Sequence, residues 1–245
     1  MPEQLLDAGF HGLARARRAR AFHPHGLWLA GELTTVADGP LPLEEGSSRP
    51  VAARLSKGAG VPGGGPDVLG LGVRIPPRDD LERPWDLALS SSGIGVVTRC
   101  LPLPARGWGR ARYSSLLPYR VAGRTVWLLA VPHGDPVSPA SLARLERWTR
   151  ERPLRFALMA GPARGGWRPA ARLVLHTVLP VPEAGRLSFD PVLNRPSGWT
   201  LAPDWLTEIR ESAYRGSREG RRAPEKPERG RQAGPVDSPG WWAGR

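Results

Sequence analysis

The sequence predicts an α+β fold in which short antiparallel strands form a barrel and helices flank it. Short apolar stretches recur along the chain, and turn residues separate them; the 30 glycines and 28 prolines support many turns of this kind. Because the strands are short and follow one another, an antiparallel sheet or barrel is favoured. We expect strands at residues 21–33, 51–55, 68–75, 85–89, 125–131, 154–159 and 173–178, the last two forming a hairpin.

Three further segments predict helices around this barrel. Residues 3–18 carry apolar side chains on one stripe and arginines behind it. A second helix, near 139–151, is expected to begin at Ser138-Pro139, because serine caps helices and proline suits their first position. A third helix would run over 204–218. The packing face of the second helix would contain Leu142, Leu145 and Trp148.

The pattern divides the chain into three parts. Residues 1–19 form a helical arm, residues 20–222 the folded domain, and residues 223–245 a basic tail. The tail contains mostly proline, glycine, arginine and glutamate, with little to bury apart from Val236 and Trp241-Trp242. Such a composition predicts a disordered segment.

Composition excludes several classes of protein. The single cysteine, Cys100, rules out disulfide scaffolds and cysteine-rich zinc sites within the chain. No apolar run approaches the roughly 20 residues that span a bilayer, so no membrane partner is expected. At the N-terminus, acidic residues precede the arginines, which is the reverse of the order in a secretion signal and predicts a cytoplasmic protein.

The net charge of +12 suits acidic partners. No nucleic-acid-binding motif accompanies this charge, so we do not expect nucleic acid as a partner.

Two patterns that could indicate chemistry have simpler explanations. Residues 58–63 match G-x-G-x-x-G, but Pro62 prevents a helix from starting there, so no helix N-terminus would face a pyrophosphate. The paired carboxylates Glu44-Glu45 and Asp79-Asp80 lie near prolines in turns. Solvated loops explain both patterns.

His23 and His25 are the histidines that stand out. Strand alternation would place both imidazoles on one face and Phe22 on the other. Two histidines alone are compatible with a surface pair, with metal ligands or with catalysis. No third ligand lies at a suggestive spacing.

A resemblance to haem catalases begins at these histidines. Residues 20–27, RAFHPHGL, are similar to the catalase stretch RVVHAKG, which carries the distal histidine. Three later blocks resemble the catalase segments VRFS, RGFAVKF and WDL, and they are Ala53–Ser56, Leu69–Ile75 and Trp85–Leu87. Phe189-Asp190-Pro191 is similar to a further segment. The resemblance spans roughly residues 18–222 and implies an antiparallel barrel of the catalase-like type.

The segment around Tyr214 resembles the iron-binding helix of catalases. That family binds haem iron through a tyrosine with an arginine four residues earlier, and Arg210 and Tyr214 have this spacing. Ser217 and Arg221 follow at the family's offsets, and on a helix all four share one stripe. The alternative is that Tyr214 only packs on a core face.

The resemblance implies a peroxidase or organic hydroperoxidase that carries haem b. Tyr214 would be the proximal iron ligand, assisted by Arg210, and His23 the distal acid and base, oriented by Ser56. Three arginines match positions that hold haem propionates, and they are Arg20, Arg54 and Arg221.

Departures from the catalase pattern modify this expectation. Ser90 stands where catalases have an asparagine that assists peroxide, and the aromatic that stacks on haem has no counterpart at Ile94-Gly95. The chain is also about half a catalase's length. We therefore expect slow turnover of peroxide or an organic hydroperoxide. The alternative functions are a haem-free scaffold or basic binding protein, and nucleic-acid binding through the arginine-rich ends.

Overall fold

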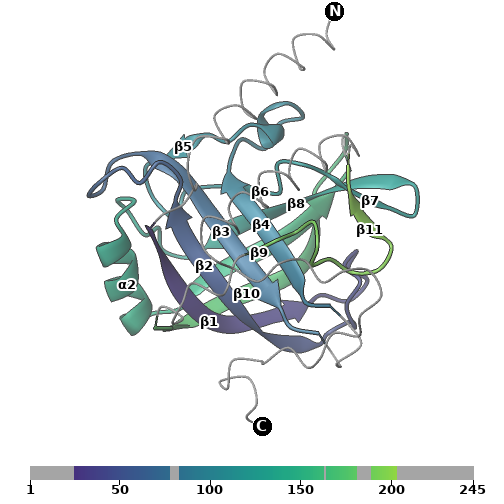
Figure 1. Cartoon of the computed structure of the whole chain (residues 1–245), viewed down its shortest axis with the longest axis horizontal. Helices are drawn as coiled ribbons and strands as arrows, with labels where there is room; N and C mark the ends of the chain where they lie inside the picture. The colour runs from purple at the N-terminus through teal and green to yellow at the C-terminus, as the bar shows by residue number, and fades with distance from the viewer. Residues whose placement is uncertain (1–24, 78–82, 163, 181–188, 203–245) are drawn as a thin grey trace, which may run out of the picture.

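Eight strands form a closed antiparallel barrel (Figure 1). The computed structural model describes residues 25–77, 83–162, 164–180 and 189–202. Each barrel strand pairs with the next one along the chain, and the last pairs with the first, so the topology is up-and-down. The barrel strands are β1 (His25–Thr35), β2 (Ser48–Lys57), β3 (Asp67–Ile75), β4 (Trp85–Ser91), β6 (Tyr113–Ser114), β8 (Arg124–His133), β9 (Leu154–Gly161) and β10 (Arg168–Val178).

Short elements decorate the barrel. Strand β5 (Pro104–Ala105) pairs with β3, and β7 (Tyr119–Val121) pairs with both β8 and β11 (Trp199–Leu201). A 3-10 turn, η1 (Thr98–Cys100), follows β4. The short strands lie in segments for which the sequence predicted no strand.

The predicted barrel is confirmed, but the α+β class with flanking helices is wrong. Within the described residues the only α-helix is α2 (Leu142–Glu151), and the fold is a mostly-β closed barrel. The helices expected at 3–18 and 204–218, and the tail at 223–245, lie outside the described residues. No helix in the described part of the chain combines the length and the apolar character that crossing a membrane requires.

Helix α2 starts three residues later than the sequence suggested. Ser141, not Ser138, is the N-cap, and its hydroxyl oxygen accepts a 3.4 Å hydrogen bond from the backbone N–H of Arg144. The expected packing face is correct, because Leu145 is fully buried while Leu142 and Trp148 pack partly buried against the core. The helix therefore covers part of the barrel wall.

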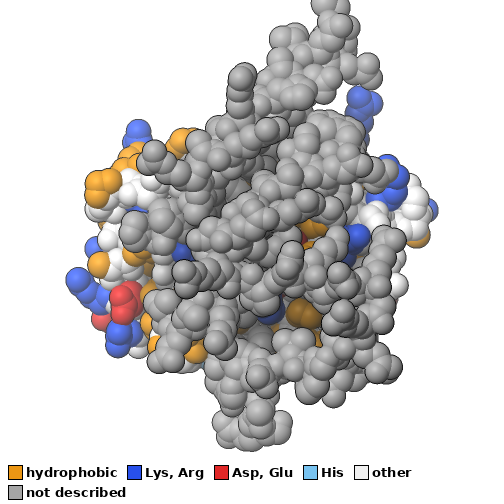
Figure 2. Space-filling model, in the orientation of Figure 1, with side chains coloured by type: hydrophobic (Ala, Val, Ile, Leu, Met, Phe, Trp, Pro, Cys, Tyr) orange, Lys and Arg blue, Asp and Glu red, His pale blue; other side chains and the backbone are white. Residues whose placement is uncertain are grey.

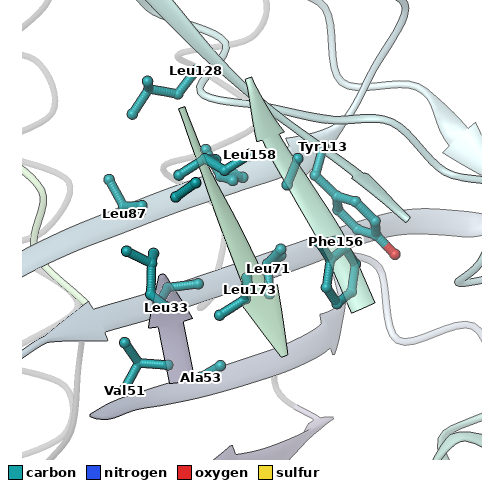
Figure 3. Close-up of a cluster of buried hydrophobic side chains, with 14 of the residues drawn as sticks. Leu33, Val51, Ala53, Leu71, Leu87, Tyr113, Leu128, Phe156, Leu158 and Leu173 are labelled. Atoms are coloured by element: carbon teal, nitrogen blue, oxygen red, sulfur yellow. The ribbon is translucent and has the colours of Figure 1, made fainter. Parts of the chain in front are cut away.

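Hydrophobic side chains, most of them aliphatic, fill the interior of the barrel (Figure 3). Every second residue of each long strand points inward, as the period of two requires. On β2 the inward residues are Val51, Ala53 and Leu55, and all three have no exposed surface. The core continues with Leu33, Leu71, Leu87, Leu128, Phe156, Leu158 and Leu173.

The seam between β1 and β10 closes the barrel and depends on a glycine. The pairing of β1 with β10 shifts register between Ala30 and Gly31, which marks an irregularity in the ladder. A Cβ atom at Gly31 would overlap the carbonyl oxygen of Val174 on the partner strand. Only glycine allows the two backbones to approach this closely.

We predict that Gly31→Ala opens this seam and lowers the free energy of unfolding by at least about 2 kcal/mol, because the added methyl group collides with backbone that cannot move aside. Gly166→Ala is the matched control, since a Cβ there meets nothing within 4 Å. Urea denaturation of both variants measures the effect. Equal stability of the two variants would show that the seam tolerates a side chain.

Candidate functional site

The outer face of β1 to β4 and β6 carries a row of small residues. Cross-strand pairing aligns one residue from each of five neighbouring strands in what we term the serine row, which consists of Gly26, Ser56, Gly70, Ser90 and Ser114. These residues alternate with the inward core residues, so they face away from the barrel interior. Five strands about 4.8 Å apart make a floor about 19 Å across that carries no side chain larger than serine.

An arginine and two aromatic rings border the serine row. Arg54 and Trp28 are paired across β2 and β1 in the next row, and the Arg54 guanidinium lies 5.7 Å from the Trp28 ring centroid. A Cβ at Gly26 would lie 2.8 Å from the guanidinium carbon of Arg54, so the arginine extends over the end of the serine row. Phe189 stacks on Trp28 with ring centroids 5.4 Å apart. The border therefore combines a cation with an apolar wall.

Phe189 needs a glycine beneath it. A Cβ at Gly72 would lie 2.6 Å from the ring of Phe189, so the ring sits directly on the backbone of β3. The guanidinium carbon of Arg74 lies 5.8 Å from the centroid of the same ring. The segment that begins at Phe189 is thus fitted to the outer face.

A buried ion pair fixes that segment to the barrel. Asp86, on β4, has no exposed surface, and its two carboxylate oxygens accept hydrogen bonds of 2.7 and 2.6 Å from Arg74. The same carboxylate accepts bonds from the backbone N–H of Asp190 (2.8 Å) and the side-chain amide of Asn194 (2.7 Å). Four donors compensate the desolvation of one buried carboxylate.

Asp190 then orders its own turn. One of its carboxylate oxygens accepts hydrogen bonds of 3.1 Å from the backbone N–H groups of Val192 and Leu193. The backbone N–H of Asp86 donates to the carbonyl of Asn194 at 2.9 Å. Residues that lie about a hundred positions apart in the sequence are therefore joined at the edge of the aromatic wall.

Three of the sequence-predicted site residues share this face. Ser56 and Ser90 lie in the serine row, separated by Gly70 and hence by about 10 Å, and Arg54 lies in the adjacent row. Ser56 is buried and Ser90 half-buried. Ser56 faces away from the barrel interior, because Leu55 is the residue of this pair that enters the core.

The other predicted site residues lie outside the described part of the chain. They are Arg20, His23, Arg210, Tyr214 and Arg221. The backbone of His25 pairs with Lys57, at the start of β1. Their expected roles stay predictions.

The two described tyrosines, Tyr113 and Tyr119, are both buried in the hydrophobic core. Tyr113 is fully buried and its hydroxyl donates to the carbonyl of Trp108 at 3.1 Å. Burial raises the pKa of Tyr113 above its ordinary value, so its phenol stays protonated. Tyr119 is buried against the ring of Trp199, with centroids 5.4 Å apart. Neither tyrosine presents a phenolate oxygen to the outer face.

The two histidines whose side chains the structure describes, His133 and His176, lie on other strands than those of the serine row. His176 is exposed on β10, where its Nδ1 lies 2.8 Å from the hydroxyl of Thr177. His133 is exposed at the end of β8. Among the residues that the structure describes, no three His, Cys, Asp or Glu side chains come together as a metal site.

A separate cavity opens at one end of the barrel, beside α2. Its volume is about 210 Å³, and its lining includes Trp108, His133, Asp135, Trp148, Arg152 and Phe156. Asp135 and Arg152 form an exposed ion pair of 3.3 Å there. None of the predicted site residues that the structure describes lines this cavity, and it is smaller than a typical ligand pocket. The outer face is the stronger candidate.

Sequence reasoning missed the roles of Trp28, Arg74 and Asp86. Asp86 and Arg74 lay in blocks noted only for their resemblance to catalase segments. The available signal was a carboxylate within an otherwise buried strand, Trp85-Asp86-Leu87, which requires a partner if it is buried. The identity of that partner depends on the register between β3 and β4.

No known protein-family model matches the sequence, and the search of curated proteins found no match either.

We predict that Asp86→Ala lowers the free energy of unfolding by about 3 kcal/mol, because it removes the buried ion pair with Arg74 and the acceptor of two further hydrogen bonds. The Phe189 segment should also become sensitive to protease. Asp135→Ala removes an ion pair that is exposed on both sides, so its stability should change little. An Asp86→Ala protein as stable as the Asp135→Ala protein would contradict the anchoring role.

Proposed function

We propose that this chain is a haem-dependent peroxidase, related to the catalase-like superfamily, that holds haem b against the outer face of β1 to β4. The observation that carries the proposal is the common face of Ser56, Ser90 and Arg54, the three described residues to which the catalase resemblance assigns a role. The substrate would be hydrogen peroxide or an organic hydroperoxide.

The shape of the outer face suits a flat ligand. The barrel interior is filled with aliphatic side chains, so a macrocycle has to lie outside it. The serine row provides a floor without bulky side chains, and the Trp28–Phe189 stack provides an apolar boundary. Arg54, at the edge of the floor, would pair with a haem propionate, because a guanidinium fork matches a carboxylate.

Tyr214 would be the iron ligand, as its catalase-like spacing to Arg210 implies. Of the three tyrosines in the chain, Tyr113 and Tyr119 are occupied in the core. Arg210, four residues before Tyr214, would stabilise the negative charge on its oxygen. Arg20 and Arg221 would supply further cations for the propionates.

The chain's own residues would carry the proton. When bound, haem supplies the iron that accepts the oxidising equivalents of the peroxide. His23 would take a proton from the peroxide oxygen nearest the iron and return it to the oxygen that leaves. Ser56 would orient the imidazole from the serine row. Ser90, shorter than the asparagine of catalases, would hold hydrogen peroxide less firmly, which favours slow turnover and organic hydroperoxides.

The first test removes the proposed ligand oxygen. We predict that the full chain, mixed with haem, shows a Soret band, and that Tyr214→Phe abolishes or shifts it. Tyr113→Phe is the matched control, because it deletes a phenol oxygen that bonds to Trp108 in the core. A spectrum that Tyr214→Phe leaves unchanged would refute the ligand assignment. If the wild-type chain shows no Soret band at all, the haem-free scaffold or basic binding protein is the better description.

The second test separates binding from chemistry. His23→Ala should keep the Soret band and lose about 10²–10⁴-fold in peroxidase turnover, the usual contribution of general acid–base catalysis. His133→Ala is the control, since that histidine is exposed at the end of β8. Unchanged turnover in His23→Ala would exclude this residue and make His25 the next candidate.

A further inference from the structure

An apolar loop follows β4, and it presents large side chains to solvent. Among the residues that the structure describes, every exposed large hydrophobic side chain lies between residues 94 and 103. The exposed fractions reach 55% for Ile94, 53% for Val96 and 59% for Val97. In Figure 1 the loop and its helical turn extend beyond the end of β4. Contiguous exposed apolar side chains of this kind mark an interaction surface.

A buried arginine holds this loop in place. Arg99 is only 4% exposed, and its guanidinium carbon lies 4.8 Å from the ring centroid of Trp167 and 5.6 Å from that of Trp127. Its side chain donates to the carbonyls of Gly95 (3.1 Å) and Pro162 (3.0 Å). The loop is therefore tied to the barrel, and its apolar side chains are held outward instead of folding onto the core.

The stretch of sequence that contains the loop carries charge of a single sign. No Asp or Glu occurs between Asp86 and Asp135, and Arg106 and Arg110, just after the loop, are exposed. On α2, by contrast, Arg150 and Glu146 pair at 2.7 Å, and Figure 2 shows acidic and basic side chains together there. The arginines of the whole acid-free stretch are Arg99, Arg106, Arg110, Arg112, Arg120 and Arg124.

We propose that this apolar loop is a peripheral docking surface for an anionic lipid bilayer. Ile94, Val96 and Val97 enter the interface between headgroups and acyl chains, while Arg106 and Arg110 contact the negatively charged headgroups. Charge complementarity distinguishes this occupant from a second copy of the chain, whose matching surface would bring like charges together. No membrane partner was expected because no apolar run in the sequence approaches the roughly 20 residues that span a bilayer, but peripheral contact needs no such run.

The test is co-sedimentation of the full chain with sucrose-loaded vesicles, and it does not depend on haem. Binding is expected to phosphatidylcholine vesicles that contain phosphatidylglycerol, and not to phosphatidylcholine alone. The double variant Ile94→Ser with Val97→Ser should bind at least about tenfold more weakly, because both changes remove exposed apolar surface. Val121→Ser, at a half-buried valine of β7 outside the loop, should bind as the wild type does.

A second pair of substitutions tests the charge. Arg106→Gln and Arg110→Gln should each weaken binding about fivefold, and raised salt should weaken the wild type further. No binding to the anionic vesicles, equal binding to both vesicle types, or full binding by the Ile94→Ser, Val97→Ser variant would each overturn the proposal. It would also be overturned by a wild-type dimer in size-exclusion chromatography that this variant converts to monomer, because a second copy would then cover the loop.

Discussion

The pairing of β1 with β10 is the constraint on which the rest of this structure depends. It closes the sheet, and closure gives every long strand one inner and one outer face. The inner face is packed with hydrophobic side chains such as Leu71 and Leu173. Closure therefore moves any ligand chemistry to the outer wall or to the ends of the barrel.

The outer wall of β1 to β4 differs from an ordinary solvated strand surface. Ala52, Ser56 and Asp86 all point outward, yet each is buried. The Phe189–Asn194 segment covers part of this outer wall, and Asp86, paired with Arg74, holds the segment in place. A buried ion pair of this kind fixes the position of the Phe189–Asn194 segment more than it adds net stability, because the cost of desolvating the two charges offsets much of their mutual attraction. The pair determines where the aromatic wall stands relative to the serine row.

Local patterns in the sequence predicted most of the strands correctly. Apolar stretches between glycines and prolines located all the long strands, and the packing face of α2 followed from its periodicity. The short strands β6 and β7 were not predicted, because a strand of two or three residues is too short to show an alternation of apolar and polar side chains. The expectation of flanking helices drew on apolar periodicity and capping residues at 3–18, 139–151 and 204–218, and the first and last of these segments lie outside the described residues.

The site was harder to predict than the strands. Alternation shows that Ser56 and Leu55 face opposite ways, but it does not show which one faces inward when both faces of a strand are buried, as on β2. The serine row itself was not predictable, because its members come from five strands and meet only through the register between them. Likewise, the partner of Asp86 became apparent only once β3 lay beside β4.

The central claim is that the serine row is the floor of a ligand site, and a titration with haem tests it most directly. Ser90→Trp places a large ring on that floor at a half-buried position, whereas Thr177→Trp places the same ring on exposed β10, outside the row. Absorbance at the Soret band should increase on haem addition for the wild type and for Thr177→Trp, and should fail to do so for Ser90→Trp while its melting temperature stays within a few degrees. Haem binding by a folded Ser90→Trp protein with the affinity of the wild type would contradict the claim.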